Sequence, residues 1–147
     1  MLNPIQSMYR DVILDHYEHP RNCHDLAHVD AEQEGYNPLC GDHVDIKIEA
    51  HDNTLTDVSV CTKGCAICTA SGSIMSGILK GKTLPEVDQL IQDVKAHLTG
   101  ESNMDMSSQP SVLKVLEGVR KFPVRIKCAL LPWTTLEIIL RERKGQD

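Results

Sequence analysis

The sequence predicts an α+β fold, in which a small antiparallel sheet of about three strands carries helices packed on one face. Three observations predict it. Residues 44–60 alternate apolar and polar side chains around one turn, the flanking segments have the helical period, and 147 residues suit a single domain. A composition with 41% hydrophobic and 24% charged residues is ordinary for a globular protein. We therefore treat residues 1–147 as one domain.

The first elements follow from the spacing of apolar residues. Residues 4–18 carry a helical stripe that stops before His19-Pro20. Residues 19–42 have little periodicity and contain prolines and glycines, so they are predicted to be mostly loop. Strict alternation over 44–50, turn residues at 51–54 and a β-branched run over 55–60 predict an antiparallel hairpin.

The second half is predicted to be helical. Apolar residues at helical spacing cover 66–79, with an end at Gly81, and 84–98, with an end at Gly100. A polar loop is expected over 101–110, followed by short helices at about 111–119 and 128–143. Pro132 would be tolerated only in the first turn of the last helix.

Charge and hydropathy exclude several classes of function. The chain has 15 basic and 21 acidic residues, a net charge of −6, which argues against binding to nucleic acid or to an anionic membrane. The apolar runs are far too short for a membrane span. The first residues show neither the basic nor the apolar region of a signal peptide, so a cytoplasmic protein is expected.

Cysteines are the most informative residues. There are six of them: Cys23, Cys40, Cys61, Cys65, Cys68 and Cys128. In a reducing compartment, clustered thiols bind metals or react more often than they form disulfides. Cys40 and Asp42 flank Gly41 in a turn before the first strand, and Cys65 begins a helix, where the dipole favours thiolate.

The last cysteine, Cys128, enters the final helix directly after two cations. Arg125 and Lys127 precede it and are expected to lower the pKa of its thiol. Three thiolates and one carboxylate from separate loops suit one tetrahedral metal site. Zinc accepts both kinds of donor, whereas an iron–sulfur cluster accepts mainly cysteine.

These motifs also carry a family resemblance. Asn37-Pro38-Leu39-Cys40-Gly41-Asp42, Gly64-Cys65 and Arg125-Ile126-Lys127-Cys128-Ala129-Leu130 resemble the NifU-like (U-type) iron–sulfur cluster assembly family, as do residues 9–17 and 19–22. The IscU-type branch has His immediately before the last cysteine, where this chain has Lys127. The SufU-type branch has Lys there and an extra segment, for which residues 82–108 leave room, so the resemblance points to SufU.

The resemblance implies a sulfur relay in iron–sulfur cluster assembly. A SufU-like protein accepts persulfide sulfur from a PLP-dependent cysteine desulfurase (SufS-like) and passes it to the downstream assembly machinery. It would act as a zinc-dependent sulfurtransferase that needs the desulfurase as its partner and is not a catalyst by itself. The implied Zn²⁺ ligands are Cys40, Asp42, Cys65 and Cys128. Cys40 is the expected sulfur acceptor because its turn can swing toward a partner. Arg125 would pair with Asp42 or with a residue of the donor.

Two alternatives use the same residues. A scaffold would assemble a labile [2Fe–2S] cluster on Cys40, Cys65 and Cys128, and a structural zinc module would serve only interaction. Lys127 disfavours the scaffold, and a carboxylate ligand disfavours the closed structural site.

The remaining thiols and histidines have other expected roles. Cys65 and Cys68 could form a thioredoxin-like dithiol, but the surrounding pattern of strands and helices is missing. Together with Cys61 this pair has the Cys-x3-Cys-x2-Cys spacing that resembles the cluster-binding motif of radical S-adenosylmethionine enzymes. Those enzymes use a large barrel-like domain, which 147 residues cannot supply. We expect Cys68 to pack near the site, Cys23 to be a free surface thiol, and His43 to be an ordinary residue at a strand start.

Overall fold

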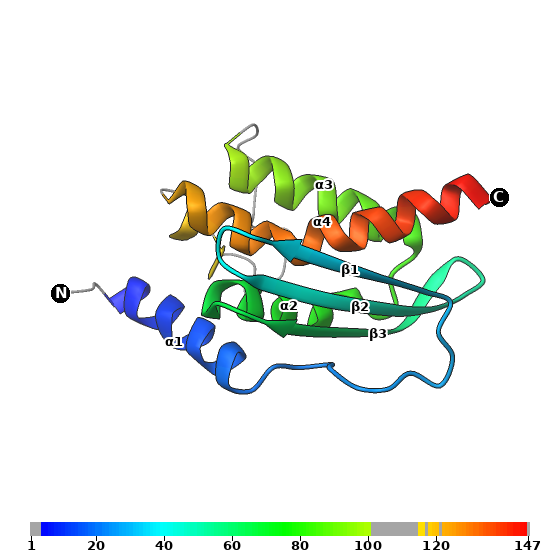
Figure 1. Cartoon of the computed structure of the whole chain (residues 1–147), viewed down its shortest axis with the longest axis horizontal. Helices are drawn as coiled ribbons and strands as arrows, with labels where there is room; N and C mark the ends of the chain where they lie inside the picture. Colours follow the sequence, from blue (N-terminus) through cyan, green and yellow to red (C-terminus); the bar gives the residue numbers. More distant parts are fainter. Residues whose placement is uncertain (1–3, 101–114, 117, 121, 147) are drawn as a thin grey trace.

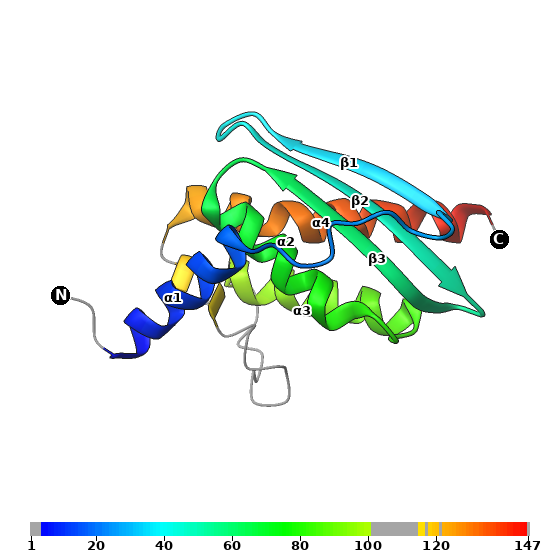
Figure 2. The ribbon, with the colours of Figure 1, turned by 90° about the horizontal axis from the view of Figure 1, so that it is seen from below.

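One antiparallel sheet with helices on one face organises the molecule. The computed structural model describes residues 4–100, 115–116, 118–120 and 122–146. The elements in chain order are α1 (Pro4–Glu18), β1 (Ala31–Asn37), β2 (Asp42–His51), β3 (Thr54–Lys63), α2 (Ala66–Leu79), α3 (Leu84–Thr99) and α4 (Pro123–Gln146). The sheet has the order β1-β2-β3, and α2 and α4 pack on one of its faces (Figures 1 and 2). The predicted α+β fold is confirmed.

The central hairpin forms as the alternation predicts. Val44, Ile46 and Ile48 of β2 are completely buried against the helices, while the intervening residues face away from them. Asp52 and Asn53 make the turn to β3 with φ angles of 50° and 66°, the positive values that a tight hairpin turn requires. The predicted hairpin is therefore confirmed.

Strand β1 is a correction to the predicted loop over residues 19–42. Residues 31–37 pair with β2 along their whole length, from Ala31 opposite Ile48 to Asn37 opposite Asp42. The segment has none of the β-branched residues by which strands are recognised in a sequence. A Cβ at Gly35 would collide with Thr135 Oγ1 of α4, so this glycine allows the helix to approach the sheet.

Helices α1, α2 and α3 lie where the apolar periodicity predicts them. Thr83 caps α3 in a reciprocal capping box with Glu86, and Gly100 ends the helix with a φ of 80°. Among the described residues, the core between sheet and helices is mainly aliphatic, and its largest fully buried members include Ile46, Ile48, Leu55, Ile74, Met75, Leu79, Ile91, Trp133 and Leu136. None of the described helices combines the length and apolarity needed to cross a bilayer.

Helix α4 differs from its predicted range of 128–143. It begins earlier, at Pro123, so that Cys128 lies in its second turn. Pro132 lies inside the helix and not in its first turn, so that prediction is wrong. Pro132 has no N–H for the carbonyl of Cys128, and its buried ring packs beside Gly72 of α2. The predicted loop 101–110 and the beginning of the predicted helix 111–119 lie outside the described residues.

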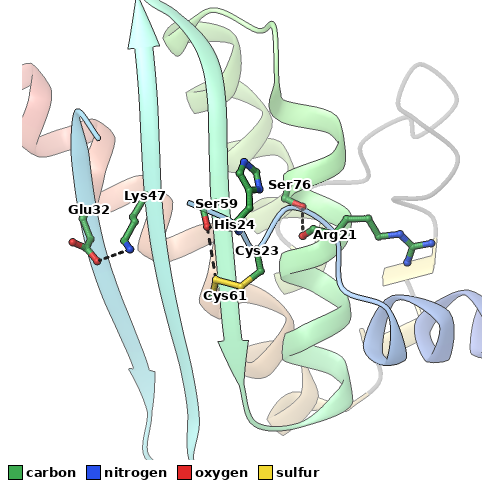
Figure 3. Close-up of a disulfide and its surroundings, with 8 residues drawn as sticks. All are labelled: Arg21, Cys23, His24, Glu32, Lys47, Ser59, Cys61 and Ser76. Atoms are coloured by element: carbon green, nitrogen blue, oxygen red, sulfur yellow. Dashed lines mark hydrogen bonds and ion pairs between the residues drawn. A yellow bond between two sulfur atoms is a disulfide. The ribbon is translucent and has the colours of Figure 1, made fainter. Parts of the chain in front are cut away.

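The segment 19–29, here called the strap, runs from α1 along the edge of β3. Cys23 of the strap forms a disulfide with Cys61 of β3 (Figure 3). The expectation that Cys23 is a free surface thiol is therefore wrong. The two cysteines are 38 positions apart, and the strap brings them together by a path that local sequence patterns do not reveal.

Candidate metal centre

The predicted ligands converge at one end of the sheet. Cys40 lies in the turn between β1 and β2, Asp42 begins β2, Cys65 precedes α2, and Cys128 lies near the start of α4. These segments share one end of the molecule (Figure 1). The ligand atoms of Cys40, Asp42 and Cys128 all lie within 4.8 Å of one another, with 3.1 Å between the two sulfurs. The Cys65 thiol lies 3.6 Å from Asp42 Oδ2.

The turn that carries Cys40 is built on Asn37. The Asn37 carbonyl accepts a hydrogen bond from Cys40 N at 3.3 Å, and its side-chain Oδ1 accepts one from Leu39 N at 3.2 Å. The Asn37 amide also donates to Cys128 Sγ at 3.9 Å. Asn37 was not among the predicted site residues, although the Asn-Pro pair is a typical turn signal. Its contacts show that it both shapes the turn and supports a candidate ligand.

Asp42 is held without any exposure to solvent. Its Oδ1 accepts a hydrogen bond from Cys65 N at 2.8 Å. Gly64 has a φ of 142° and passes so close that a Cβ there would lie 2.8 Å from Asp42 Cα and would also meet Asp42 Oδ1. The chain thus fixes the carboxylate between the start of β2 and the start of α2.

Cys65 is the N-cap of α2, as the sequence predicts. Its sulfur accepts a hydrogen bond from Cys68 N at 3.3 Å, which places the thiol over the unpaired amides of the first helical turn. Cys68 itself is completely buried. Burial, together with the nearby carboxylate of Asp42, raises the pKa of the Cys68 thiol to about 12, so this thiol stays protonated.

Cys128 is only 3% exposed, and this overturns one expectation. Burial and then the hydrogen bond with Cys40 raise the pKa of the Cys128 thiol, whereas the flanking cations were expected to lower it. Those cations are exposed to solvent, which screens their charge. The thiolate form of Cys128 would therefore have to be favoured by a cation bound in the cluster. Arg125 and Lys127 do not supply that charge.

Arg125 and His43 lie at the margin of the cluster. The Arg125 guanidinium stacks over the ring of Phe122, 4.7 Å from its centroid. Within the part of the chain that the structure describes, Arg125 makes no ion pair with Asp42, and its role stays a prediction. His43 points its Nε2 toward Glu34 at 3.8 Å, in keeping with an ordinary residue at a strand start.

Fold and site together define a small α+β domain that gathers three thiols and a carboxylate at one end of its sheet. The chain belongs to the family of the NifU-like N-terminal domain, which matches residues 8–129. The resemblance seen in the motifs is thereby confirmed.

Curated relatives carry two kinds of name. The chain is 33% identical to the zinc-dependent sulfurtransferase SufU of Bacillus subtilis, over 96% of this chain and 95% of that protein. It is 32% identical to the iron–sulfur cluster assembly scaffold protein IscU of Streptococcus pyogenes, over 99% of this chain and 91% of that protein.

Solved structures agree on the fold. A crystal structure of a candidate iron–sulfur cluster assembly scaffold protein for the SUF system (FiSufU) from Fervidobacterium islandicum superposes with a TM-score of 0.82 at 29% identity, covering 92% of this chain and 98% of that one. A NifU-like protein from Brucella abortus superposes with a TM-score of 0.84 at 24% identity, which bears on the fold alone.

Proposed function

We propose that this chain is a SufU-like sulfur acceptor in iron–sulfur cluster assembly, which receives persulfide sulfur from a PLP-dependent cysteine desulfurase. The observation that carries the proposal is the convergence of Cys40, Asp42 and Cys128 within 4.8 Å, with the Cys65 thiol against the same carboxylate. Lys127 in place of a histidine supports the relay over the scaffold. The name of the SufU relative, a zinc-dependent sulfurtransferase, supports the relay, and the name of the Fervidobacterium structure supports the SUF system but describes a scaffold.

The donor set fits zinc. Three thiols and one carboxylate match the cysteine and aspartate ligands that zinc accepts in a four-coordinate site. Bound zinc would hold the thiols deprotonated and shield them until a partner arrives. Because these thiols must stay reduced to serve as ligands, we also propose a cytoplasmic location.

Cys40 is the thiol that we propose as acceptor. It is half-buried in a surface turn beside Leu39, which is 67% exposed, whereas Cys128 and Asp42 are buried. Gly41 follows with a φ of 70° and leaves the turn free of side-chain contacts on that side. Cys65 is half-buried as well, but its sulfur accepts a hydrogen bond from Cys68 N at the start of α2, so we assign the acceptor role to the thiol in the open turn, Cys40.

The transfer is redox-neutral. The Cys40 thiolate attacks the outer sulfur of the donor's persulfide, and a new sulfur–sulfur bond forms on Cys40. The sulfur–sulfur bond of the donor breaks, and its electron pair leaves with the donor cysteine as a thiolate. The outer sulfur keeps its own proton, so that Cys40 becomes a persulfide.

Cys40→Ala tests the acceptor directly. Incubated with a cysteine desulfurase and free cysteine, the variant is expected to carry no persulfide at its site and to give no more sulfur transfer than a reaction without the chain. Mass spectrometry of the intact protein measures the added sulfur. Cys68→Ala is the matched control because it also removes one cysteine, a buried thiol outside the proposed ligand set, and it should transfer as the wild type does. Undiminished transfer by Cys40→Ala would remove Cys40 from this role.

The scaffold is the second candidate, favoured by the IscU name of a relative at 32% identity. A [2Fe–2S] cluster would take Cys40, Cys65 and Cys128 as its thiolate ligands. Metal and acid-labile sulfide analysis of protein purified without air separates the two. About one zinc per chain without sulfide or colour supports the relay. Iron with matching sulfide and a brown spectrum supports the scaffold. If the protein binds zinc but accepts no sulfur from the desulfurase, the remaining interpretation is a structural zinc module.

A further inference from the structure

The Cys23–Cys61 disulfide is a second thiol site, and neither of its cysteines belongs to the candidate metal centre. We propose that this pair exchanges reversibly with small thiols and disulfides, and that its oxidation state controls how firmly the strap and α1 are held against α2. The proposal goes beyond the proposed function and does not depend on it.

The bond is placed where a small thiol can reach it. Cys23 lies in the strap and is exposed, and Cys61 lies half-buried on β3, with 4.9 Å between the two Cα atoms (Figure 3). Thiol–disulfide exchange requires access of a thiolate to one of the sulfurs. Because Cys23 is at the surface, exchange can begin without opening of the apolar core.

The strap also has polar attachments to β3, among them an ion pair between His24 Nε2 and Asp57 Oδ2 at 3.1 Å. Val60 N of β3 donates to Asn22 O at 2.9 Å, and His24 N donates to Ser59 Oγ at 3.2 Å. Each of these bonds can be replaced by bonds to water, because no residue of the strap is buried. The disulfide is thus the tie that solvent cannot replace.

The strap and α1 are fastened to α2 at a shared point. The Ser73 hydroxyl of α2 accepts a hydrogen bond from Arg21 N at 2.9 Å and bonds His16 Nδ1 of α1 at 2.7 Å. Ser76, further along α2, bonds Asn22 Nδ2 at 3.1 Å. Release of the strap therefore weakens the attachment of α1, which ends at Glu18, shortly before Cys23.

The attachment of α1 to α2 lies close to the candidate metal centre. Helix α1 lies at the same end as the β1–β2 turn and the start of α2, which carry Cys40 and Cys65 (Figures 1 and 2). In reducing compartments, protein disulfides are mostly transient and redox-sensing. A reversible tie on α1 would thus change the surroundings of the thiol cluster without altering its ligands.

The exchange balances with glutathione as the co-reactant. On oxidation, one cysteine thiolate attacks glutathione disulfide and releases one glutathione, and the second cysteine displaces the other glutathione. The two cysteines lose two protons and two electrons, and glutathione disulfide becomes two thiols. Reduction is the reverse, with two glutathione thiols as the reductant.

Hydrogen exchange followed by mass spectrometry tests the switch on the full chain. The oxidised protein is compared with the same protein in excess reduced glutathione. We expect exchange in the strap and α1 to become at least about tenfold faster on reduction, while β2 keeps its rate. Equal rates in the two states would overturn the proposal, as would a bond that excess glutathione leaves intact.

Two variants serve as controls for effects of glutathione on the other thiols. Cys23→Ser and Cys61→Ser each remove the bond, and both keep Cys40, Cys65, Cys68 and Cys128. Each should exchange at the rate of the reduced wild type, whether or not glutathione is present. If either variant keeps the slow exchange of the oxidised protein, the disulfide does not hold the strap.

Discussion

Asp42 and Gly64 form the most tightly constrained pair of residues in the candidate site. The carboxylate is completely buried, accepts the Cys65 amide hydrogen at 2.8 Å, and leaves Oδ2 toward the thiols. Gly64 passes against the Cα of Asp42, in a backbone conformation that side chains rarely adopt. One candidate ligand is therefore positioned by a residue that has no side chain.

Gly64→Ala tests this constraint. The added methyl group must push Asp42 aside, since its Cβ would lie 2.8 Å from Asp42 Cα. We expect a loss of about 2–4 kcal/mol in the free energy of unfolding and weaker zinc binding. Gly77→Ala is the control, because a Cβ there meets nothing within 4 Å, and it should stabilise the exposed helical position by about 0.5–1 kcal/mol. Urea denaturation and zinc titration give both values, and equal effects of the two substitutions would contradict the constraint.

At the scale of elements, a buried carboxylate joins α3 to α4. Glu137 of α4 is 8% exposed, and its carboxylate forms ion pairs with Lys95 Nζ of α3 at 2.9 Å and with Arg141 Nη2 at 3.1 Å. Burial acts to raise the pKa of Glu137, but the hydrogen bonds from Gln92, Lys95 and Arg141 outweigh it and hold this pKa below its usual value. The ionised form therefore stabilises the packing of the two helices.

The lowered pKa fixes the sign of a pH dependence. The stabilisation is complete above the unfolded pKa of about 4.3 and is lost as pH falls through the lower folded pKa. Glu137→Gln should cost about 1–3 kcal/mol at neutral pH, because Lys95 loses its charged partner, and the difference from wild type should shrink in acid. Urea denaturation over a pH series measures it, with Glu142→Gln on the exposed side of α4 as control. A difference that is independent of pH would exclude the ionised carboxylate as its source.

The elements also differ in how far the sequence predicts them. The stripe of α1 and the alternation of β2 are local signals, and the structure follows them closely. Strand β1 forms by pairing with the edge of β2, and its own polar residues show no local strand pattern. The cluster is similar: Cys40 and Cys65 were recognisable as turn and N-cap positions, whereas the pairing of Cys23 with Cys61 depends on the path of the strap.

At the scale of the whole molecule, the proposed site ties distant parts of the chain together. Its donors come from the β1–β2 turn, the first residue of β2, the start of α2 and the second turn of α4. The unfolded chain holds Cys40 and Cys128 88 positions apart, so that a preformed site exists only in the folded state. Binding of a metal ion there is therefore linked to global folding.

That linkage gives a prediction about thermal stability. Free zinc at a hundredfold excess over its Kd should stabilise the native state by about 2.7 kcal/mol. For a chain of 147 residues this corresponds to a rise in Tm of roughly 5–10 °C, and a chelator should reverse it. Asp42→Ala should lose most of the rise because it removes a buried donor, whereas Asp25→Ala, an exposed carboxylate of the strap, should keep it. Differential scanning calorimetry measures all three proteins, and a full zinc-dependent shift in Asp42→Ala would show that the carboxylate is not a ligand.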